Sequence, residues 1–407
     1  MIFYFDDLNK CTSNLEKLSK NGDVDFWLVA PGSPIKKTLI EMSIQYEHID
    51  NIDSSGIYWI DVRGDSHWWS GVLTDIGAPP THILEEVPNN ILELVRQRKL
   101  RIVIAADREG SPMLTENWDC FSSTEKCIRK LGLPEKSVLI LHGDYNVVFQ
   151  HESWKKDNLM EFQYSNHFSR IFDDESLPDI PIIKKSIENQ NSLAFNSLNR
   201  THRPQRAMHL YWLAKNNYLV NGLVSCNELN FNDLFPQQFL ECNDYTDVMK
   251  QHYPRHVDGD WEKINAANQY NTEIYANSLM SFITETIFFG SSVFITEKIF
   301  KPLRIGHPMI LLASKGTLSA LRDIGFRTDW CGIDTSYNDI EDDKERFIAT
   351  HNVLKKWIIT STQEKIDLIN ASESTILHNQ ELLKKRDLYK EAITDAIYNT
   401  RKYFDGF

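Results

Sequence analysis

Residues 294–302, with the sequence FITEKIFKP, place a carboxylate and two ammonium groups at the predicted start of a short helix. Val293 to Ile295 predict the end of a buried strand, and Thr296 is a favourable N-cap residue. Glu297 and Lys298 then fall in the first turn, where unpaired backbone N–H groups point outward and the helix dipole attracts negative charge. The segment therefore predicts an anion site that suits a diphosphate.

The other charged groups near this turn have separate predicted tasks. Lys301 lies near the helical face of Lys298 and would add a second cation. Glu297 would accept pairs of hydrogen bonds from hydroxyl groups of a ribose or of a transferred sugar. Glu285 follows a predicted strand at Leu279–Thr284. It would approach the sugar, orient Lys298, or pair within its own domain.

A basic group earlier in the chain is a second candidate for phosphate binding. Arg203 and Arg206 flank Pro204, which can begin a helix directly after a predicted strand at Leu193–Leu198. A guanidinium can bind two phosphate oxygens at once, and the spacing alone does not choose between the two arginines. Asn199 lies just past the same strand and would support the site from behind.

These residues belong to a series of motifs spread over residues 192–330. The series consists of Phe195–Asn199 with Arg203 and Arg206, Gly222–Ser225, Tyr275–Ser278, Ile283–Thr286, Thr296–Lys298 and Pro308–Ile310. In this order the motifs resemble the donor-binding half of α1,3-fucosyltransferase-like and exostosin-like glycosyltransferases. The first 190 residues carry no motif of this kind.

The resemblance implies a hexosyl or pentosyl transferase whose Thr-Glu-Lys turn contacts a UDP- or GDP-linked sugar. It implies an arginine that balances the departing diphosphate, for which Arg206 is the better match. It also implies a single inverting displacement without a metal or other cofactor, because glycosyltransferases of the GT-B fold generally hold the diphosphate with basic residues and helix dipoles. Asp258-Gly259-Asp260, which has the spacing of a metal-binding D-x-D element, is therefore not interpreted as a metal site.

Transfer to a hydroxyl also needs a base that removes the acceptor proton, and we expect it from the N-terminal half. Acidic residues and histidines follow three predicted strands there, at Ile57–Val62, Arg101–Ala106 and Val138–Leu141. The catalytic candidates are Glu109, Asp107, Asp65 and Asp61, with His142 and Asp144 as alternatives. The acceptor-binding candidates are His67, Trp68 and Trp69, whose rings suit a sugar or a base.

Short apolar runs that alternate with helical patterns predict how these residues are positioned. The alternation occurs before and after a polar, proline-containing stretch at Asp173–Pro181, which predicts two parallel sheets covered by helices on both faces. This is the α/β GT-B architecture, with two doubly wound Rossmann-like domains. The predicted domains are an acceptor-side domain at 1–185, a nucleotide-sugar-binding domain at 186–340 and a helical tail at 341–407 that packs across both.

Composition limits the alternatives. The chain has 407 residues, 42% of them hydrophobic and 25% charged, as in ordinary soluble globular proteins. Six scattered cysteines without a C-x-x-C pair predict reduced thiols. Met1 to Phe5 predict a first strand and no leader, and no apolar run is long enough to span a membrane. We therefore expect a protein of the bacterial or phage-infected host cytoplasm.

The sequence leaves more than one acceptor open. A glycan is the simplest choice for this family. The alternative is a phage-type DNA glycosyltransferase that acts on 5-hydroxymethylated bases, with Trp68 and Trp69 holding an extruded base. The net charge of −13 argues against a general electrostatic grip on DNA but permits a local basic groove. A third alternative is a GT-B-like sugar or nucleotide binding protein that has lost catalysis.

Overall fold

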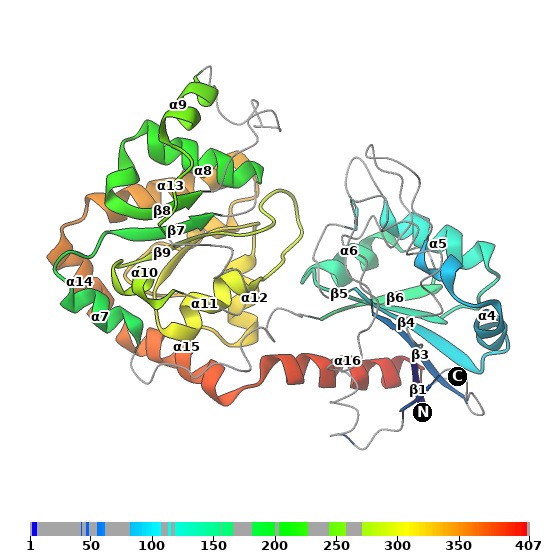
Figure 1. The fold of residues 1–407 in the computed structure, drawn as a ribbon. Coiled ribbons are helices and arrows are strands. Elements are labelled where there is room, and N and C mark those ends of the chain that lie inside the picture. The colour runs from blue at the N-terminus through cyan, green and yellow to red at the C-terminus, as the bar shows by residue number, and fades with distance from the viewer. Residues whose placement is uncertain are drawn as a thin grey trace. The chain divides into compact units, whose positions relative to one another are not determined.

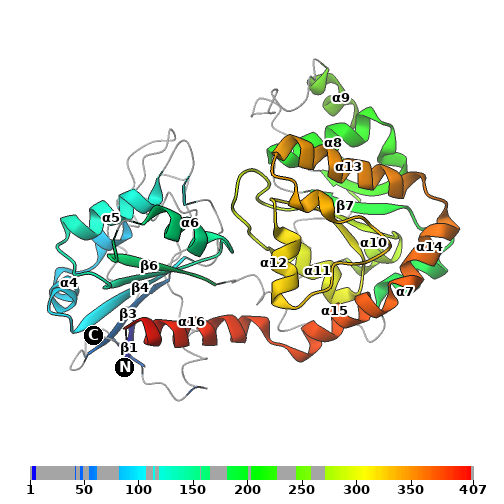
Figure 2. The ribbon, with the colours of Figure 1, turned by 180° about the vertical axis from the view of Figure 1, so that it is seen from behind.

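The chain folds into two compact units, Met1–Arg170 with Leu388–Phe407 and Ile171–Asp387. The computed structural model describes residues 2–5, 42, 46–48, 55–61, 82–106, 113–114, 119–155, 157–165, 181–199, 203–226, 244–257 and 271–404. Both units are built on a sheet whose described strands pair in parallel (Figures 1 and 2).

The first unit contains a six-stranded sheet in the order β2-β1-β3-β4-β5-β6. Its strands are β1 (Ile2–Phe5), β2 (Tyr46–His48), β3 (Gly56–Asp61), β4 (Leu100–Ala106), β5 (Val138–His142) and β6 (Met160–Tyr164). Its helices are the 3-10 turn η2 (Ile83–Glu86), α4 (Asn89–Arg96), α5 (Cys120–Lys130), α6 (Val147–Trp154) and α16 (Leu388–Phe404).

Helices cover both faces of this sheet, which explains why its central strands are almost entirely apolar. Side chains alternate between the faces of a strand. Tyr58 and Ile60 accordingly pack into the core under α4, α5 and α6. Ile57 and Trp59 pack on the opposite face, where α16 contributes Ala396, Ile397 and Phe404. A strand buried on both faces has no polar side to show in the sequence.

The second unit contains a four-stranded sheet in the order β10-β9-β7-β8. Its strands are β7 (Phe195–Asn199), β8 (Gly222–Cys226), β9 (Ser281–Thr284) and β10 (Met309–Leu312). Its helices are α7 (Ile182–Glu188), α8 (Pro204–Lys215), the 3-10 turn η4 (Tyr218–Asn221), α9 (Tyr245–His252), α10 (Thr272–Ala276), α11 (Glu297–Ile305), α12 (Thr317–Ile324), the 3-10 turn η5 (Ser336–Asp339), α13 (Asp343–Ile359), α14 (Thr362–Ala371) and α15 (Glu373–Lys385).

In this unit α8 and α13 lie on one side of the strands, and α11 and α15 lie on the other (Figures 1 and 2). Close packing between strands limits the side chains that fit. A Cβ atom at Gly222 on β8 would lie 2.5 Å from the ring of Phe195 on β7, so the position needs glycine.

These two doubly wound units confirm the predicted α/β class. Each unit has its own parallel sheet, as the predicted GT-B architecture requires. Two details of the prediction were wrong. Val293 to Ile295 are buried, but they lie outside any strand. The sequence around Ile35 to Tyr46 predicts a helix, but Tyr46 begins β2. The helical tail expected at 341–407 is confirmed as four consecutive helices, α13, α14, α15 and α16, with Ser361 capping α14.

The unit boundaries also differ from the predicted ones. The first unit ends at Arg170, before the boundary expected at residue 185. The C-terminal helices are shared between the units, since α13 to α15 belong to the second and α16 to the first. Among the described residues, no helix is both long enough and apolar enough to cross a bilayer.

Candidate functional site

Helix α11 begins as the sequence predicted. Thr296 has extended backbone angles, and its Oγ1 accepts a hydrogen bond from the backbone N–H of Lys298 at 3.3 Å, which makes Thr296 the N-cap. Ile299, Phe300 and Leu303 bury one face of the helix. Gly306 ends it in the left-handed region with φ of 68°. Glu297 and Lys298 therefore lie in the first turn, beside the outward-pointing N–H groups.

A buried carboxylate, that of Glu285, holds the N-cap residue Thr296 in place. Glu285 follows β9 and is 0% exposed. Its Oε1 accepts from the backbone N–H of Thr296 at 3.0 Å, and both of its oxygens lie 2.8 Å from Thr296 Oγ1. Its Oε2 also accepts from the backbone N–H of Thr286 at 2.7 Å. Glu285 thus ties the end of β9 to the start of α11.

The ammonium of Lys298 has three partners in the same place. Nζ donates to Thr286 Oγ1 at 3.3 Å, to Thr296 Oγ1 at 3.1 Å and to Glu297 Oε1 at 2.9 Å. Adjacent residues on a helix do not normally face each other. The pairing of Glu297 with Lys298 is therefore a feature of this N-terminal turn. We call Glu285, Thr286, Thr296, Glu297 and Lys298 the α11 cluster.

The charges in and around the α11 cluster are mutually dependent. Burial by itself would raise the pKa of Glu297, but Lys298 and Lys301 hold that pKa below its ordinary value, so Glu297 is ionised at neutral pH. Burial raises the pKa of Glu285, and Lys298 opposes this effect. The side chains of Lys298 and Glu297 are 26% and 16% exposed, so both can be reached by a ligand.

Helix α8 brings the predicted arginines to different environments. Arg203 is the exposed N-cap residue before Pro204, whereas Arg206 is only 4% exposed. Arg206 Nη2 donates to the backbone oxygen of Thr284 at 3.3 Å, at the end of β9. Burial lowers the pKa of Arg206 to about 10, which still leaves it charged at neutral pH; nearby Glu285 and Glu297 raise this pKa and Arg203 lowers it. Arg206 therefore lies within electrostatic reach of the α11 cluster.

Gln205 is a member of the site that sequence reasoning missed. It is 2% exposed, and its Nε2 donates to the backbone oxygens of Glu285 at 2.7 Å and Thr286 at 3.0 Å. These bonds fasten the start of α8 to the segment that carries the α11 cluster. A glutamine in the first turn of a helix is usually exposed, so the sequence contained no signal for this contact.

Asn199 is engaged in the framework beneath the site. It is the last residue of β7 and is 2% exposed. Its Oδ1 accepts from Thr284 Oγ1 at 2.6 Å, and its Nδ2 donates to Ser197 Oγ at 3.1 Å. These bonds join the ends of β7 and β9; a role of Asn199 at the donor site stays a prediction.

The structure describes only some of the predicted base and acceptor-binding residues. Asp65, His67, Trp68, Trp69, Asp107 and Glu109 lie outside the described residues. Asp61 is the last residue of β3, and the strand register pairs it with Ala105 at the carboxyl edge of the sheet. Ala106, directly before Asp107, pairs with His142 at the same edge. The backbone therefore brings these strand ends together.

The two alternative base residues, His142 and Asp144, are wrong for that role. Both are 0% exposed. His142 Nδ1 accepts from the backbone N–H of Asp144 at 3.1 Å, and burial lowers the pKa of His142 to about 3. The Asp144 oxygens accept from the Asn146 backbone and the Gln150 side chain, both at 2.9 Å. Neither group can meet an acceptor hydroxyl from solvent.

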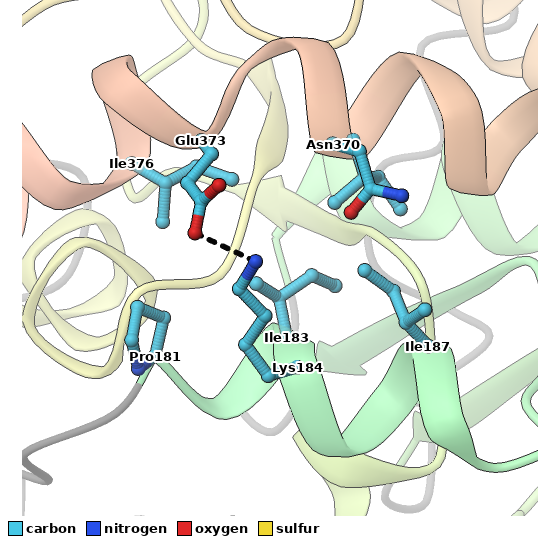
Figure 3. A pocket seen from close by; sticks show the side chains of 8 residues that line it. Pro181, Ile183, Lys184, Ile187, Asn370, Glu373 and Ile376 are labelled. Carbon is cyan, nitrogen blue, oxygen red and sulfur yellow. Dashed lines mark ion pairs between the residues drawn. The ribbon is translucent and has the colours of Figure 1, made fainter.

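Two other features carry no assigned ligand. A pocket of about 210 Å³, open mouth included, lies between α7, α14 and α15, and Lys184 and Glu373 form a 2.7 Å ion pair across it (Figure 3). It is smaller than typical ligand pockets of roughly 300–1,000 Å³. In the first unit, His151, Glu152 and Glu161 place ligand atoms within 4.8 Å of one another, but Lys155 already pairs with Glu152.

No protein-family model and no curated protein sequence matches this chain. Among solved structures, the chain is similar to MurG of Acinetobacter baumannii, with 10% identity and a TM-score of 0.28 over 98% of this chain and 99% of that one. It is also similar to the catalytic domain of starch synthase IV from Arabidopsis thaliana bound to ADP and acarbose, with 9% identity and a TM-score of 0.33 over 97% and 99%. At these TM-scores, the function of the chain must be argued from its own residues.

Proposed function

We propose that this chain is a glycosyltransferase that binds a nucleotide diphosphate sugar at the N-terminus of α11 and transfers the sugar to a hydroxyl group. The α11 cluster is the observation that carries the proposal. It combines a helix N-terminus, a partly exposed ammonium and a partly exposed carboxylate, with Arg206 in electrostatic reach. A diphosphate needs the positive groups, and the hydroxyls of a ribose or sugar suit the carboxylate.

The proposed chemistry assigns a task to each group. The acceptor oxygen attacks the anomeric carbon of the sugar while the bond from that carbon to the diphosphate oxygen breaks. Lys298, Lys301 and Arg206 stabilise the negative charge that develops on the departing diphosphate. Because Arg203 is exposed and Arg206 is buried, Arg206 is the better candidate for this role. The resemblance in the motifs suggests inversion and a mechanism without a metal.

The acceptor proton must go to a base, which we place in the first unit. Asp61 lies at the carboxyl edge of its sheet, where active sites of parallel α/β domains form. Asp65, Asp107 and Glu109 follow the same strand ends in the sequence. Because His142 and Asp144 are buried, these four carboxylates are the remaining candidates for the base.

A glycan is the proposed acceptor. A DNA base carrying a hydroxymethyl group is the second candidate, and the adjacent tryptophans Trp68 and Trp69 after a strand end are the feature that favours it. Transfer assays with glycans and with 5-hydroxymethylated DNA distinguish the two. Binding to DNA that weakens steeply with salt would favour the second candidate.

A thermal-shift screen tests the donor site. The ligands are GDP-fucose, UDP-glucose, UDP-N-acetylglucosamine, UDP-arabinose and the free nucleotides. A ligand that binds only the folded state raises the melting temperature, and we expect one nucleotide class to do so selectively. The effect should be lost in Lys298→Ala and kept in Lys384→Ala, because Lys384 is an ion-paired lysine with a similar exposure of 27%.

Two other results would count against the proposal. Stabilisation that survives Lys298→Ala would place the diphosphate elsewhere. Selective binding without any release of nucleoside diphosphate, across the glycan and DNA acceptors, would favour a binding protein that has lost catalysis. Release that depends on the acceptor would support transfer.

A further inference from the structure

Lys298 does not hold its position by itself. Two of its three hydrogen bonds go to the hydroxyls of Thr286 and Thr296, which lie near the two ends of the loop between β9 and α11. A lysine has a long, flexible side chain, so an ammonium that must meet a phosphate at a fixed point needs such partners. The two threonines must in turn be held in place.

Both threonines are fixed by the same carboxylate. Glu285 accepts from the backbone N–H of Thr286, and from the backbone N–H and the hydroxyl of Thr296. The hydroxyl of Thr296 donates to Glu285, so its hydrogen points at the carboxylate. The lone pairs of that hydroxyl then face the backbone N–H and the ammonium of Lys298.

We propose that Glu285 is the positioning residue of the donor site: it orients Thr286 and Thr296 so that their hydroxyl oxygens hold the Lys298 ammonium, and it does not touch the donor itself. This inference rests on the proposed function only because it takes the ligand of Lys298 to be the sugar donor. The contacts of Glu285, Thr286 and Thr296 with one another and with Lys298 do not depend on that function. Glu285 is 0% exposed and its oxygens are engaged with Thr286 and Thr296, so a ligand has no access to the carboxylate.

Replacement by glutamine tests this role with almost no change in shape. The side chain of Glu285→Gln has one acceptor oxygen and one NH₂ group. Whichever way the amide is turned, the NH₂ group faces a backbone N–H, of either Thr286 or Thr296. One buried donor loses its acceptor, and the Thr296 hydroxyl is free to turn its hydrogen away. Lys298 should then lose its fixed position.

The first measurement is the rate at which an amine-acylating reagent modifies Lys298, followed by mass spectrometry. Lys384 is the reference amine within each sample, since its side chain is 27% exposed against 26% for Lys298. We expect acylation of Lys298 relative to Lys384 to rise several-fold in Glu285→Gln and in Thr286→Val. It should stay at the wild-type ratio in Thr286→Ser, which keeps the hydroxyl.

Ser186→Ala controls for a general loss of stability of the second unit. Ser186 is buried on α7, and its hydroxyl donates to the backbone oxygen of Tyr275 at 2.7 Å. This variant loses a buried hydrogen bond away from the α11 cluster, so its Lys298 ratio should equal that of the wild type. Equal ratios in Glu285→Gln, Thr286→Val and the wild type would overturn the proposal. If Glu285→Gln does not fold, Glu285→Asp, whose shorter carboxylate cannot reach both threonines, takes its place with the same rise in the Lys298 ratio expected.

The second measurement is the affinity for inorganic pyrophosphate. We expect Glu285→Gln to weaken pyrophosphate binding about tenfold, the effect of one lost buried hydrogen-bond acceptor. Ser186→Ala, which lies outside the α11 cluster, should bind as the wild type does. If the wild type binds no pyrophosphate while the acylation ratios change as expected, the proposed function fails and the positioning of Lys298 by Glu285 is supported. Unchanged ratios with normal pyrophosphate binding would support the proposed function and overturn the positioning role of Glu285.

Discussion

His209 Nδ1 lies 3.0 Å from His351 Nε2, and this contact joins α8 to α13 in the interior of the second unit. His351 Nδ1 lies 2.8 Å from the backbone oxygen of Phe347, which can only accept, so this nitrogen carries a hydrogen. His351 Nε2 must then accept from His209 Nδ1. His209 Nε2 in turn accepts from the hydroxyl of Ser197 at 3.1 Å. Because burial lowers the pKa of both histidines, both rings are neutral at neutral pH, and these contacts then fix the tautomer of each.

The same chain of hydrogen bonds reaches the edge of the candidate site. Ser197 Oγ accepts from Asn199, and Asn199 Oδ1 accepts from Thr284 Oγ1. Each group donates to the next in one direction, from Thr284 to the carbonyl of Phe347. Thr284 is also the residue whose backbone oxygen accepts from Arg206. The buried polar groups of this unit thus form a continuous framework under the α11 cluster.

The first prediction concerns acid. Burial lowers the pKa of His351 to about 3, and burial together with His351 lowers that of His209 well below its ordinary value. In the unfolded chain both pKa values return to roughly 6.5. The unfolded state therefore binds more protons between about pH 3 and 6.5, and the free energy of unfolding falls as pH falls through this window. Each histidine contributes ~1.4 kcal/mol per pH unit.

Thermal unfolding of the wild type and of His351→Gln, at about pH 7.5 and about pH 5, checks this. The variant should be less stable at the higher pH, because it lacks the fitted ring, but it should lose less stability on acidification. His256→Gln is the control, since His256 is exposed. An equal loss of stability in the wild type and His351→Gln would contradict the neutral buried pair.

The second prediction decides between the two arginines. Arg206→Ala should weaken binding of the selected nucleoside diphosphate about tenfold or more, and Arg203→Ala only a few-fold. The reason is burial, because solvent screens the exposed Arg203 guanidinium more strongly than the Arg206 guanidinium, which is 4% exposed. Isothermal titration of both variants measures the effect, with circular dichroism as the check of folding. A larger loss in Arg203→Ala would reverse the assignment.

The sequence predicted most of the elements that position the site, because their signals are local. The runs at β3, β4 and β5 were found because burial on both faces leaves these strands almost entirely apolar. Thr296 was identified as a cap from its residue type alone, and the structure has it there. The strand predicted at Val293 to Ile295 was wrong, because an apolar run indicates burial but does not indicate whether the backbone pairs in a sheet.

The contacts that organise the site were beyond the sequence because they join distant residues. His209 and His351 are 142 positions apart, and nothing in either neighbourhood indicates the other. Gln205 contacts the segment 80 positions later. The sequence left Glu285 to approach the sugar, to orient Lys298 or to pair within its own domain. The structure shows that it is buried, with its oxygens hydrogen-bonded to Thr286 and Thr296. The positions of Asp65, Asp107 and Glu109 stay predictions, because they lie outside the described residues.

The third prediction concerns metals. The negative charge of a bound diphosphate would be balanced by Lys298, Lys301 and Arg206 together with the α11 N-terminus. We therefore expect the affinity for the selected nucleoside diphosphate to be the same in excess EDTA and in excess Mg²⁺. Titration calorimetry under the two conditions measures this. Binding that is lost in EDTA and restored by Mg²⁺ would show that a metal shares the diphosphate.

The fourth prediction separates the two tasks that meet at Glu297. Its carboxylate pairs with Lys298 at 2.9 Å, so a phosphate must compete with it for the same ammonium. Glu297→Gln removes this competing charge, and we expect inorganic pyrophosphate to bind several-fold more tightly to the variant. The same change weakens acceptance of hydrogen bonds from ribose or sugar hydroxyls. The preference for the nucleotide sugar over pyrophosphate should therefore fall.

Measuring both affinities in one variant makes the test independent of small changes in stability. A rise in pyrophosphate affinity with a fall in nucleotide-sugar preference would place the phosphate at Lys298 and the hydroxyls at Glu297. Glu93→Gln serves as the matched control, because Glu93 also forms a short ion pair, with Arg96 in the first unit, and should alter neither affinity. If Glu297→Gln also altered neither, the ligand would lie away from the first turn of α11, because an anion on Lys298 would lie close to the Glu297 carboxylate, which is 2.9 Å from that ammonium.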